Sequence, residues 1–231
     1  MASPGILDGA ARLEMLAERI ARLHAQSGRD VLAARSRRAL AESFAEFERA
    51  LREVTAAAAT PEARETYRLL RLLWDELRVA ASQPSTADGA RRLADRVEEV
   101  AWVAAKGVRL LHGQVPANEA SERVLAAAAA RSAAQRLAKL YLQRGWALPA
   151  DAGAREAQVA EAQVQLGFAR LRSIADADEA HAEALRVAEG QFELMRQAIA
   201  RQNLEHIAKT ADHIAETMDR VARRQAQGAP S

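Results

Sequence analysis

The amino-acid sequence repeats itself after about 117 residues, and this repeat limits the folds open to the chain more than any other feature. A shift of 117 superimposes identical residues in two places, Arg19, Ala21, Leu23, Gln26 and Gly28 on Arg136, Ala138, Leu140, Gln143 and Gly145, and Ala94, Asp95 and Glu99 on Ala211, Asp212 and Glu216. Self-similarity at a fixed period is the signature of a duplicated structural unit. We therefore predict two similar halves, residues 1–114 and 115–231, with a few extra residues at 146–153.

Both halves show the apolar spacing of helices. Leu13, Leu16, Ile20 and Leu23 recur every three or four residues, and no segment alternates polar and apolar residues as a strand would. Turn-forming residues interrupt the pattern at 27–30, 58–61, 82–86, 113–117, 146–153, 175–180 and 201–203. Connections this short favour antiparallel neighbours. The sequence thus predicts an all-α fold of about eight helices, arranged as two tandem antiparallel four-helix bundles related by a pseudo-twofold axis.

The composition narrows the possible partners. Lysine and arginine total 33 against 31 acidic residues, and the two signs are interleaved along the chain, which argues against a nucleic acid partner. No run approaches the roughly 18 apolar residues of a membrane span, and the first residues lack the features of a signal peptide. Without cysteine the chain forms neither disulfides nor thiolate metal sites. We expect a soluble, cytoplasmic protein with no membrane partner, although a soluble segment of a membrane receptor would have the same composition.

The first helix of each half carries a motif. The segments "ARLEMLAERIARLHAQSG" (11–28) and "AARSAAQRLAKLYLQRG" (129–145) both resemble the first-helix motif, approximately A-G-R-Q-R-M-L-S-Q-R-M-A-K-L-Y, of the PilJ-type sensing domain of type IV pilus chemotaxis-like transducers. That domain is similar to the nitrate and nitrite sensing domains of bacterial sensor kinases. Trp74 and Phe192, one aromatic residue in the third helix of each half, also fit the family. We interpret them and Trp102 as packing anchors, with a partner surface as the alternative for Trp102 or Trp146.

The resemblance implies a helical bundle without catalytic activity that senses a small anion, nitrate or nitrite, and passes a conformational signal along its helices. In the family, the arginine of the Q-R-M segment lies on the first helix, and two such helices flank the anion. That arginine corresponds to Arg131, whereas the first half has Glu14 at this position. The glycine of the motif is replaced by Ala11 and by Ala128. Because the two bundles use the whole chain, a partner protein would carry the output.

Helix geometry decides which of these side chains can share a ligand. Residues three or four apart lie on one helix face, so Arg131, Gln135 and Lys139 form one stripe, and Arg136 lies beside it. An anion held by both arginines therefore needs a second helix, which the duplication supplies. Guanidinium groups suit a planar oxyanion because they donate two parallel hydrogen bonds. We predict an anion site between the first and fifth helices, formed by Arg12, Arg19, Arg131, Gln135, Arg136 and Lys139.

Two other interpretations remain open for these residues. The corresponding stripe of the first half is Glu14, Glu18 and Arg22, so the glutamates could face Arg131 and replace the anion by an internal salt bridge. A buried arginine requires such a counter-charge. The protein would then be a ligand-free helical scaffold for protein-protein interaction. Alternatively, the cluster is an exposed face of an alanine-rich helix, where charge pairs are common.

The sequence offers little for catalysis or metal binding. It contains no glycine-rich phosphate loop and no G-x-S-x-G nucleophile elbow. His213 and Glu216 come closest to the Glu-x-x-His pairs of bundle metal sites, but Arg96 and Glu99 occupy the corresponding positions of the first half. An arginine cannot be a metal ligand. We therefore predict neither an enzyme nor a bound metal or cofactor.

Overall fold

The chain folds into α-helices joined by short loops. The computed structural model describes residues 3–174 and 179–226, and these ranges contain eight helices and no β-strand. The helices are α1 (Pro4–Gly28), α2 (Ala33–Ala57), α3 (Pro61–Ala81), α4 (Ala87–His112), α5 (Glu119–Gln143), α6 (Ala154–Ser173), α7 (Glu179–Ala200) and α8 (Leu204–Ala226). Their ends coincide with the predicted breaks, which confirms the all-α prediction. The break expected at 175–180 lies partly outside the described residues.

Local sequence explains why helices begin where they do. The Thr60 side chain accepts a hydrogen bond from the backbone N–H of Ala63, and Pro61 is the first residue of α3. At the start of α5, Asn118 and Ser121 exchange side-chain to backbone hydrogen bonds and so form a capping box. These bonds satisfy donors that a helix start leaves unpaired, so the local sequence specifies where α3 and α5 start.

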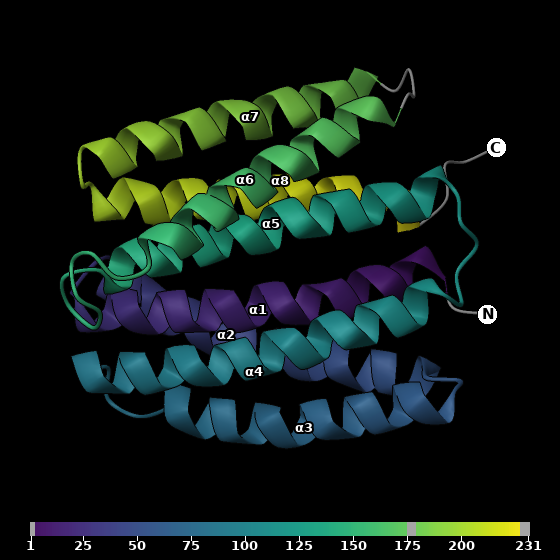
Figure 1. Ribbon diagram of the computed structural model, residues 1–231, viewed down its shortest axis with the longest axis horizontal. Helices are drawn as coiled ribbons and strands as arrows, with labels where there is room; N and C mark the ends of the chain where they lie inside the picture. Colours follow the sequence, from purple (N-terminus) through teal and green to yellow (C-terminus); the bar gives the residue numbers. More distant parts are fainter. Residues whose placement is uncertain (1–2, 175–178, 227–231) are drawn as a thin grey trace.

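The helices form two four-helix units with the same internal arrangement. In each unit the first helix packs on the second and the fourth, and the third helix packs on the fourth and the second. Figure 1 shows α1 and α5 side by side at the centre, with α2, α3 and α4 on one side and α6, α7 and α8 on the other. This repetition confirms the pseudo-twofold relation that the sequence repeat predicts.

The two units meet along α1 and α5, which run parallel. The direction follows from the residues in contact, because Asp8 pairs with Arg131 and, further along both helices, Glu18 pairs with Lys139. The helix α8 also packs against α5, and α1 lies beside α8. Alanine occupies most of α5 between Leu125 and Arg131, so the backbones can approach closely. The charged stripe of α5 is therefore carried into the middle of the molecule.

Aromatic side chains divide between the core and the surface. Trp74 is fully buried and stacks on Phe47 with 4.0 Å between ring centroids. Phe192 is buried as well and meets Phe168 edge to face. The interpretation of Trp74 and Phe192 as packing anchors is confirmed. For Trp102 it is wrong, because this side chain is 66% exposed.

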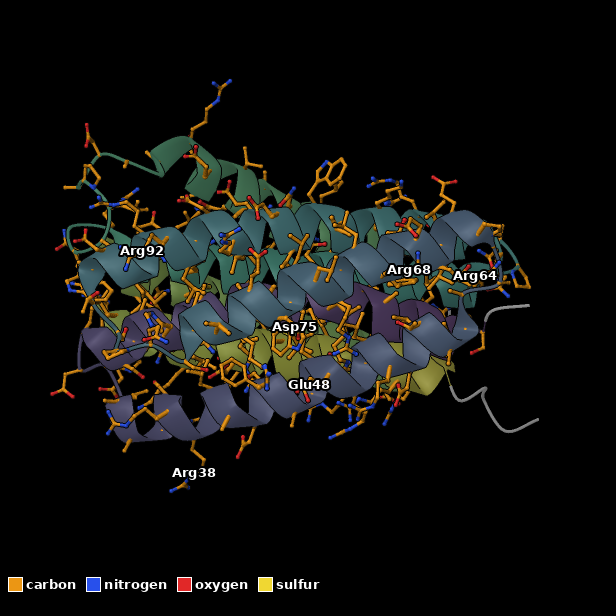
Figure 2. The ribbon with its side chains drawn as sticks, turned by 90° about the horizontal axis from the view of Figure 1, so that it is seen from below. Arg38, Glu48, Arg64, Arg68, Asp75 and Arg92 are labelled. Atoms are coloured by element: carbon orange, nitrogen blue, oxygen red, sulfur yellow. The ribbon has the colours of Figure 1, made fainter. Side chains whose placement is uncertain are left out.

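One apolar core continues from the first unit into the second. A shared core does not show whether residues 1–114 and 115–231 are separate domains, so this division stays a prediction. On the outer surface, the charged side chain of Arg38 on α2 projects away from the ribbon (Figure 2). Among the described residues no helix combines the length and the apolar character needed to cross a membrane.

Candidate functional site

The predicted residues of α5 lie at the interface where α1 and α5 join the two units. We call this interface the seam. Arg131, Gln135 and Lys139 are buried, because α1, α6 and α8 surround α5. The side chain of Arg136, one position off this stripe, remains 28% exposed. The stripe predicted from helix geometry is thus present. The interpretation as an exposed face is wrong for its three members.

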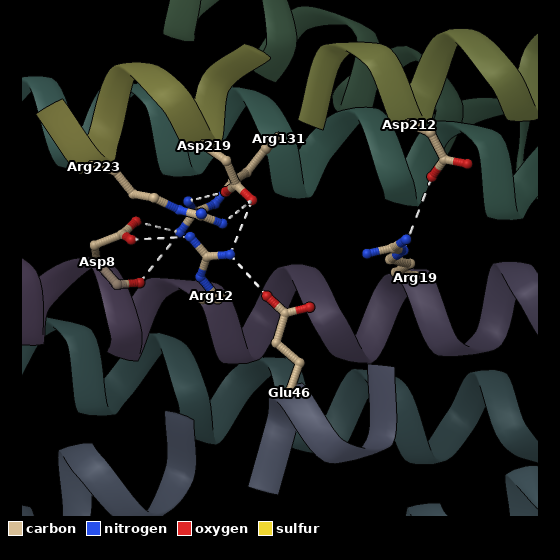
Figure 3. A network of polar contacts seen from close by, with 8 residues as sticks. All are labelled: Asp8, Arg12, Arg19, Glu46, Arg131, Asp212, Asp219 and Arg223. Atoms are coloured by element: carbon tan, nitrogen blue, oxygen red, sulfur yellow. Dashed lines mark hydrogen bonds and ion pairs between the residues drawn. The ribbon is translucent and has the colours of Figure 1, made fainter. Parts of the chain in front are cut away.

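Arg131 is neutralised by two aspartates that the sequence analysis did not select. Its Nη2 atom lies 2.8 Å from Oδ1 of Asp8, and its Nη1 atom donates a hydrogen bond of 2.6 Å to Oδ1 of Asp219 (Figure 3). The Nη2 atom also donates to the backbone carbonyl of Asp8 at 3.2 Å. Asp8 belongs to α1 and Asp219 to α8. The buried guanidinium therefore finds its counter-charges within the chain.

The expected contact of Arg131 with Glu14 and Glu18 is not formed. Side chains on a helix lean toward its N-terminus, and α1 runs parallel to α5. Arg131 therefore reaches back toward Asp8 and does not meet Glu14, which stands at the equivalent level of the first half. Both glutamates pair with other cations of α5. The prediction that they neutralise Arg131 is wrong.

Arg12 belongs to the same ion-pair network as Arg131. Its guanidinium lies 3.2 Å from Asp8, 2.9 Å from Glu46 and 2.9 Å from Asp219. Burial alone would lower the pKa of Arg12, but the attraction of Asp219 and Asp8 outweighs burial and raises it. Figure 3 shows that Asp219 lies between the two arginines. The network ties α1, α2, α5 and α8 together at one level of the molecule.

Arg136 and Lys139 neutralise the two glutamates of α1. The buried carboxylate of Glu18 lies 2.8 Å from Nζ of Lys139 and 2.8 Å from Nε of Arg136. Glu14 lies 3.3 Å from Nη2 of Arg136. Burial raises the pKa of Glu14, whereas for Glu18 the two cations outweigh burial and lower the pKa. Glu18 is thus held as a carboxylate by cations of the other unit.

Gln135 holds a second buried arginine. Its Oε1 atom accepts a hydrogen bond of 2.7 Å from Nε of Arg22, which also donates to Asp212 at 2.5 Å. The shift of 117 converts Glu18 into Gln135 and Arg22 into Lys139. The contact of Gln135 with Arg22 is therefore the pseudo-symmetric counterpart of the Glu18–Lys139 ion pair, with the carboxylate replaced by an amide.

Arg19 has the weakest partner among the predicted residues. Its Nε atom lies 3.9 Å from Oδ1 of Asp212 and, within the described part of the chain, makes no hydrogen bond. In Figure 3 this pair lies apart from the network around Arg131. The six predicted residues thus fall into three groups. Arg12 and Arg131 share Asp8 and Asp219, and Arg136 and Lys139 share Glu18. Gln135 and Arg19 are linked through Arg22 and Asp212.

Sequence reasoning missed the carboxylates Asp8, Asp219 and Glu46 and the central place of Arg22. Asp8 and Arg12 are four residues apart on one helix, a spacing that could have identified them as an ion pair. Arg22 could have been found through its counterpart Lys139. Nothing local points to Asp219, since only the packing of α8 brings it to Arg131.

A cleft opens beside the group formed by Arg136 and Glu18. It has a volume of about 490 Å³ and lies between α4 and α6. Its floor is charged, and the exposed side chains of Trp102 and Val159 form apolar walls. Trp102 occupies the position that corresponds to Asp219 in the second unit. The two sides of the seam therefore differ, because ion pairs close one side and an apolar cleft remains on the other.

Comparisons with known proteins do not identify the chain. No protein-family model, curated protein or solved structure matches it. Among the described residues, no three His, Asp or Glu side chains gather closely enough to hold a metal ion. The likeness to PilJ-type domains therefore stays a prediction that rests on the first-helix motif.

Proposed function

We propose that this protein is a non-catalytic helical module that acts by binding a partner protein, built like a fused PilJ-type sensing dimer. The observation that carries the proposal is the pairing of the buried Arg131 with Asp8 and Asp219. An anion could bind the two Nη atoms of this guanidinium only by displacing one of the aspartates. A buried carboxylate left without a counter-charge costs several kcal/mol, so the chain's own aspartates take the place of a ligand.

The cleft between α4 and α6 is the proposed partner-binding surface. Trp102 is 66% exposed and Val159 is 48% exposed, and they line the same concave surface. Large apolar side chains at such places anchor protein interfaces, and tryptophan is the most frequent anchor. At the equivalent position on the other side of the seam, Asp219 is engaged by Arg12 and Arg131. Among the described residues, ion pairs therefore occupy the position of Asp219, whereas the equivalent position of Trp102 is accessible to a partner.

The cleft fits an amphipathic helix of the partner. Ala101, Trp102 and Ala105 lie on one face of α4, and the two alanines leave room for side chains of an added helix. Glu98, Glu156 and Arg155 also line the cleft, and none of the three makes an ion pair to the described residues. A partner helix with an apolar face, a lysine or arginine opposite the two glutamates and a carboxylate opposite Arg155 would complement the walls and these charges.

Site-specific photo-crosslinking tests the proposal. With p-benzoyl-phenylalanine at position 102, expressed in the source organism, we expect one dominant crosslinked protein. The same residue at position 72 is the control, because Leu72 is 59% exposed but lies on α3, away from the cleft. With the purified partner, Trp102→Ala should weaken binding at least tenfold and Leu72→Ala should not. Equal crosslinking at both positions, or unchanged affinity of Trp102→Ala, would contradict the proposal.

The anion sensor implied by the family resemblance is the second candidate. Arg19 favours it, because among the described residues its one carboxylate within ion-pair distance, that of Asp212, lies 3.9 Å away. Thermal unfolding in nitrate, nitrite and chloride at equal ionic strength separates the two candidates. The partner-binding module should unfold at the same temperature in all three salts. A rise specific to nitrate or nitrite that disappears in Arg19→Gln would instead establish the sensor.

A further inference from the structure

A separate cleft lies at the end of the molecule where the loops after α1, α5 and α7 meet. This is the left end of the ribbon in Figure 1. The cleft has a volume of about 510 Å³. Arg29 and Arg144 supply its charge. Its apolar wall is formed by Tyr141, Ile199, Leu204 and Ile207.

The charge of this cleft is uncompensated. Arg29 and Arg144 are its only charged lining residues, and within the described part of the chain neither makes an ion pair. Arg12 and Arg131, by contrast, are each held by at least two carboxylates. Burial lowers the pKa of Arg29, as expected for a cation without a carboxylate partner. Two guanidinium groups at one cleft with no acid among its lining residues favour an anionic ligand.

Both guanidinium groups are held in place while keeping donors free. The Nη1 atom of Arg29 donates to the carbonyl oxygens of Leu142 at 3.0 Å and Arg144 at 3.2 Å. Its Nε and Nη2 atoms make no hydrogen bond to the described residues. The guanidinium of Arg144 lies over the ring of Tyr141, 4.7 Å from the centroid. Fixed donors reduce the entropy lost when a ligand binds.

Helix ends of both signs meet at the cleft. The helix α8 begins at Leu204, which lines the cleft, so the positive end of its dipole lies there. The carbonyl groups at the end of α5 would oppose an anion, but Arg29 donates to two of them. The C-terminal end of α7 also lies at the cleft, at Ile199, so the two guanidinium groups, and not the helix ends, supply its positive charge.

At the corresponding place of the first unit, side chains of both units fill the space. The shift of 117 takes Gly28 to Gly145. A Cβ atom built at Gly28 would lie 2.5 Å from Trp146 and 2.6 Å from Oγ of Ser85, whereas a Cβ atom at Gly145 would meet no atom within 4 Å. The open space at Gly145 is thus particular to the second unit, and the bundle architecture alone does not require it.

We propose that this cleft binds a small organic acid. Its carboxylate would lie between Arg29 and Arg144, and its aromatic or aliphatic body would pack against Tyr141, Ile199, Leu204 and Ile207. The volume falls within the range of small-molecule pockets, about 300 to 1,000 Å³. The site shares no residue with the cleft at Trp102 or with the network of Arg131, so it does not depend on the proposed function.

Isothermal titration calorimetry with 2-naphthoate as the probe tests the site. We expect binding at one site per chain, and at least tenfold weaker binding of the neutral amide 2-naphthamide and of acetate, which lacks the apolar body. Arg144→Gln should weaken 2-naphthoate binding at least tenfold, and Ile199→Glu, which places a carboxylate in the cleft, should do the same. Arg155→Gln is the matched control, because Arg155 lies in the other cleft and makes no ion pair to the described residues.

The titration has outcomes that overturn the proposal. These are no heat from 2-naphthoate at millimolar concentration, equal affinity for the amide, and unchanged affinity in both Arg144→Gln and Ile199→Glu. If inorganic phosphate binds as tightly as 2-naphthoate, the apolar wall contributes nothing and the assigned ligand class is wrong. Circular dichroism of each variant establishes that it is folded.

Discussion

At the scale of single residues, the molecule is organised by buried charges that belong to different helices. Asp219 forms ion pairs with Arg12 and Arg131, and Asp8 forms ion pairs with the same two arginines. In a low-dielectric interior each of these groups depends on its partners, since an unpaired charge is far costlier than a paired one. Removal of one carboxylate should therefore destabilise the whole seam.

Asp8→Asn tests this dependence through pH. Burial would raise the pKa of Asp8, but Arg131 and Arg12 outweigh it and hold the pKa below the ordinary 3.8. A depressed folded-state pKa adds stability above pH 3.8 that is lost as the pH falls through the folded-state value. We expect the variant to lose about 3 kcal/mol of unfolding free energy at pH 7 and progressively less below pH 3.8, measured by urea denaturation.

Glu65→Gln is the control for Asp8→Asn. Glu65 pairs with Arg68 at 2.5 Å, and both side chains are mostly exposed. Loss of such a surface pair should change the unfolding free energy at pH 7 by at most about 0.5 kcal/mol. A pH-independent effect of Asp8→Asn, or an effect as small as that of the control, would show that the aspartate does not act as a paired carboxylate.

At the scale of elements, α5 is the helix on which the arrangement depends. It packs on α1, α6 and α8, and its alanine-rich surface allows all three to approach closely. The helix α6 approaches α5 closely at Gly167, where an added Cβ atom would lie 2.9 Å from Cβ of Ala130 and 3.0 Å from the carbonyl oxygen of Ala126. The close packing of α6 on α5 thus requires a residue without a Cβ atom at position 167.

Alanine substitutions at two helical glycines should have opposite effects. Gly167→Ala pushes α6 away from α5 and should lower the unfolding free energy by about 1 to 3 kcal/mol, as overpacking does. Gly190→Ala on α7 meets no atom within 4 Å, so it should gain up to about 1 kcal/mol from helix propensity. Urea denaturation measures both. If both variants were stabilised, α5 and α6 would not be in close contact.

At the scale of the whole molecule, the two units share a continuous apolar core and several ion pairs across the seam. Neither half can leave the other without exposing the buried face of α1 or α5. The sequence repeat therefore indicates how the fold arose, by duplication. It does not imply that the two halves fold independently.

Calorimetry measures this coupling directly. We expect one heat-absorption peak with equal calorimetric and van't Hoff enthalpies, because residues 1–114 and 115–231 unfold together. Addition of moderate salt should leave the single peak intact, since the apolar core also joins the units. Two resolved peaks, or a calorimetric enthalpy well above the van't Hoff value, would mean that the halves are separate domains.

The sequence by itself determined the eight helices, their ends and the two repeated units, because helical spacing, caps and turn residues act within a few positions of the chain. It also determined that Arg131, Gln135 and Lys139 share a face. Only the tertiary structure decided which carboxylates meet Arg131, since Asp8 and Asp219 lie 123 and 88 residues away in the chain. Any of 31 acidic residues could have served, and the choice depended on the direction of α1 and the position of α8.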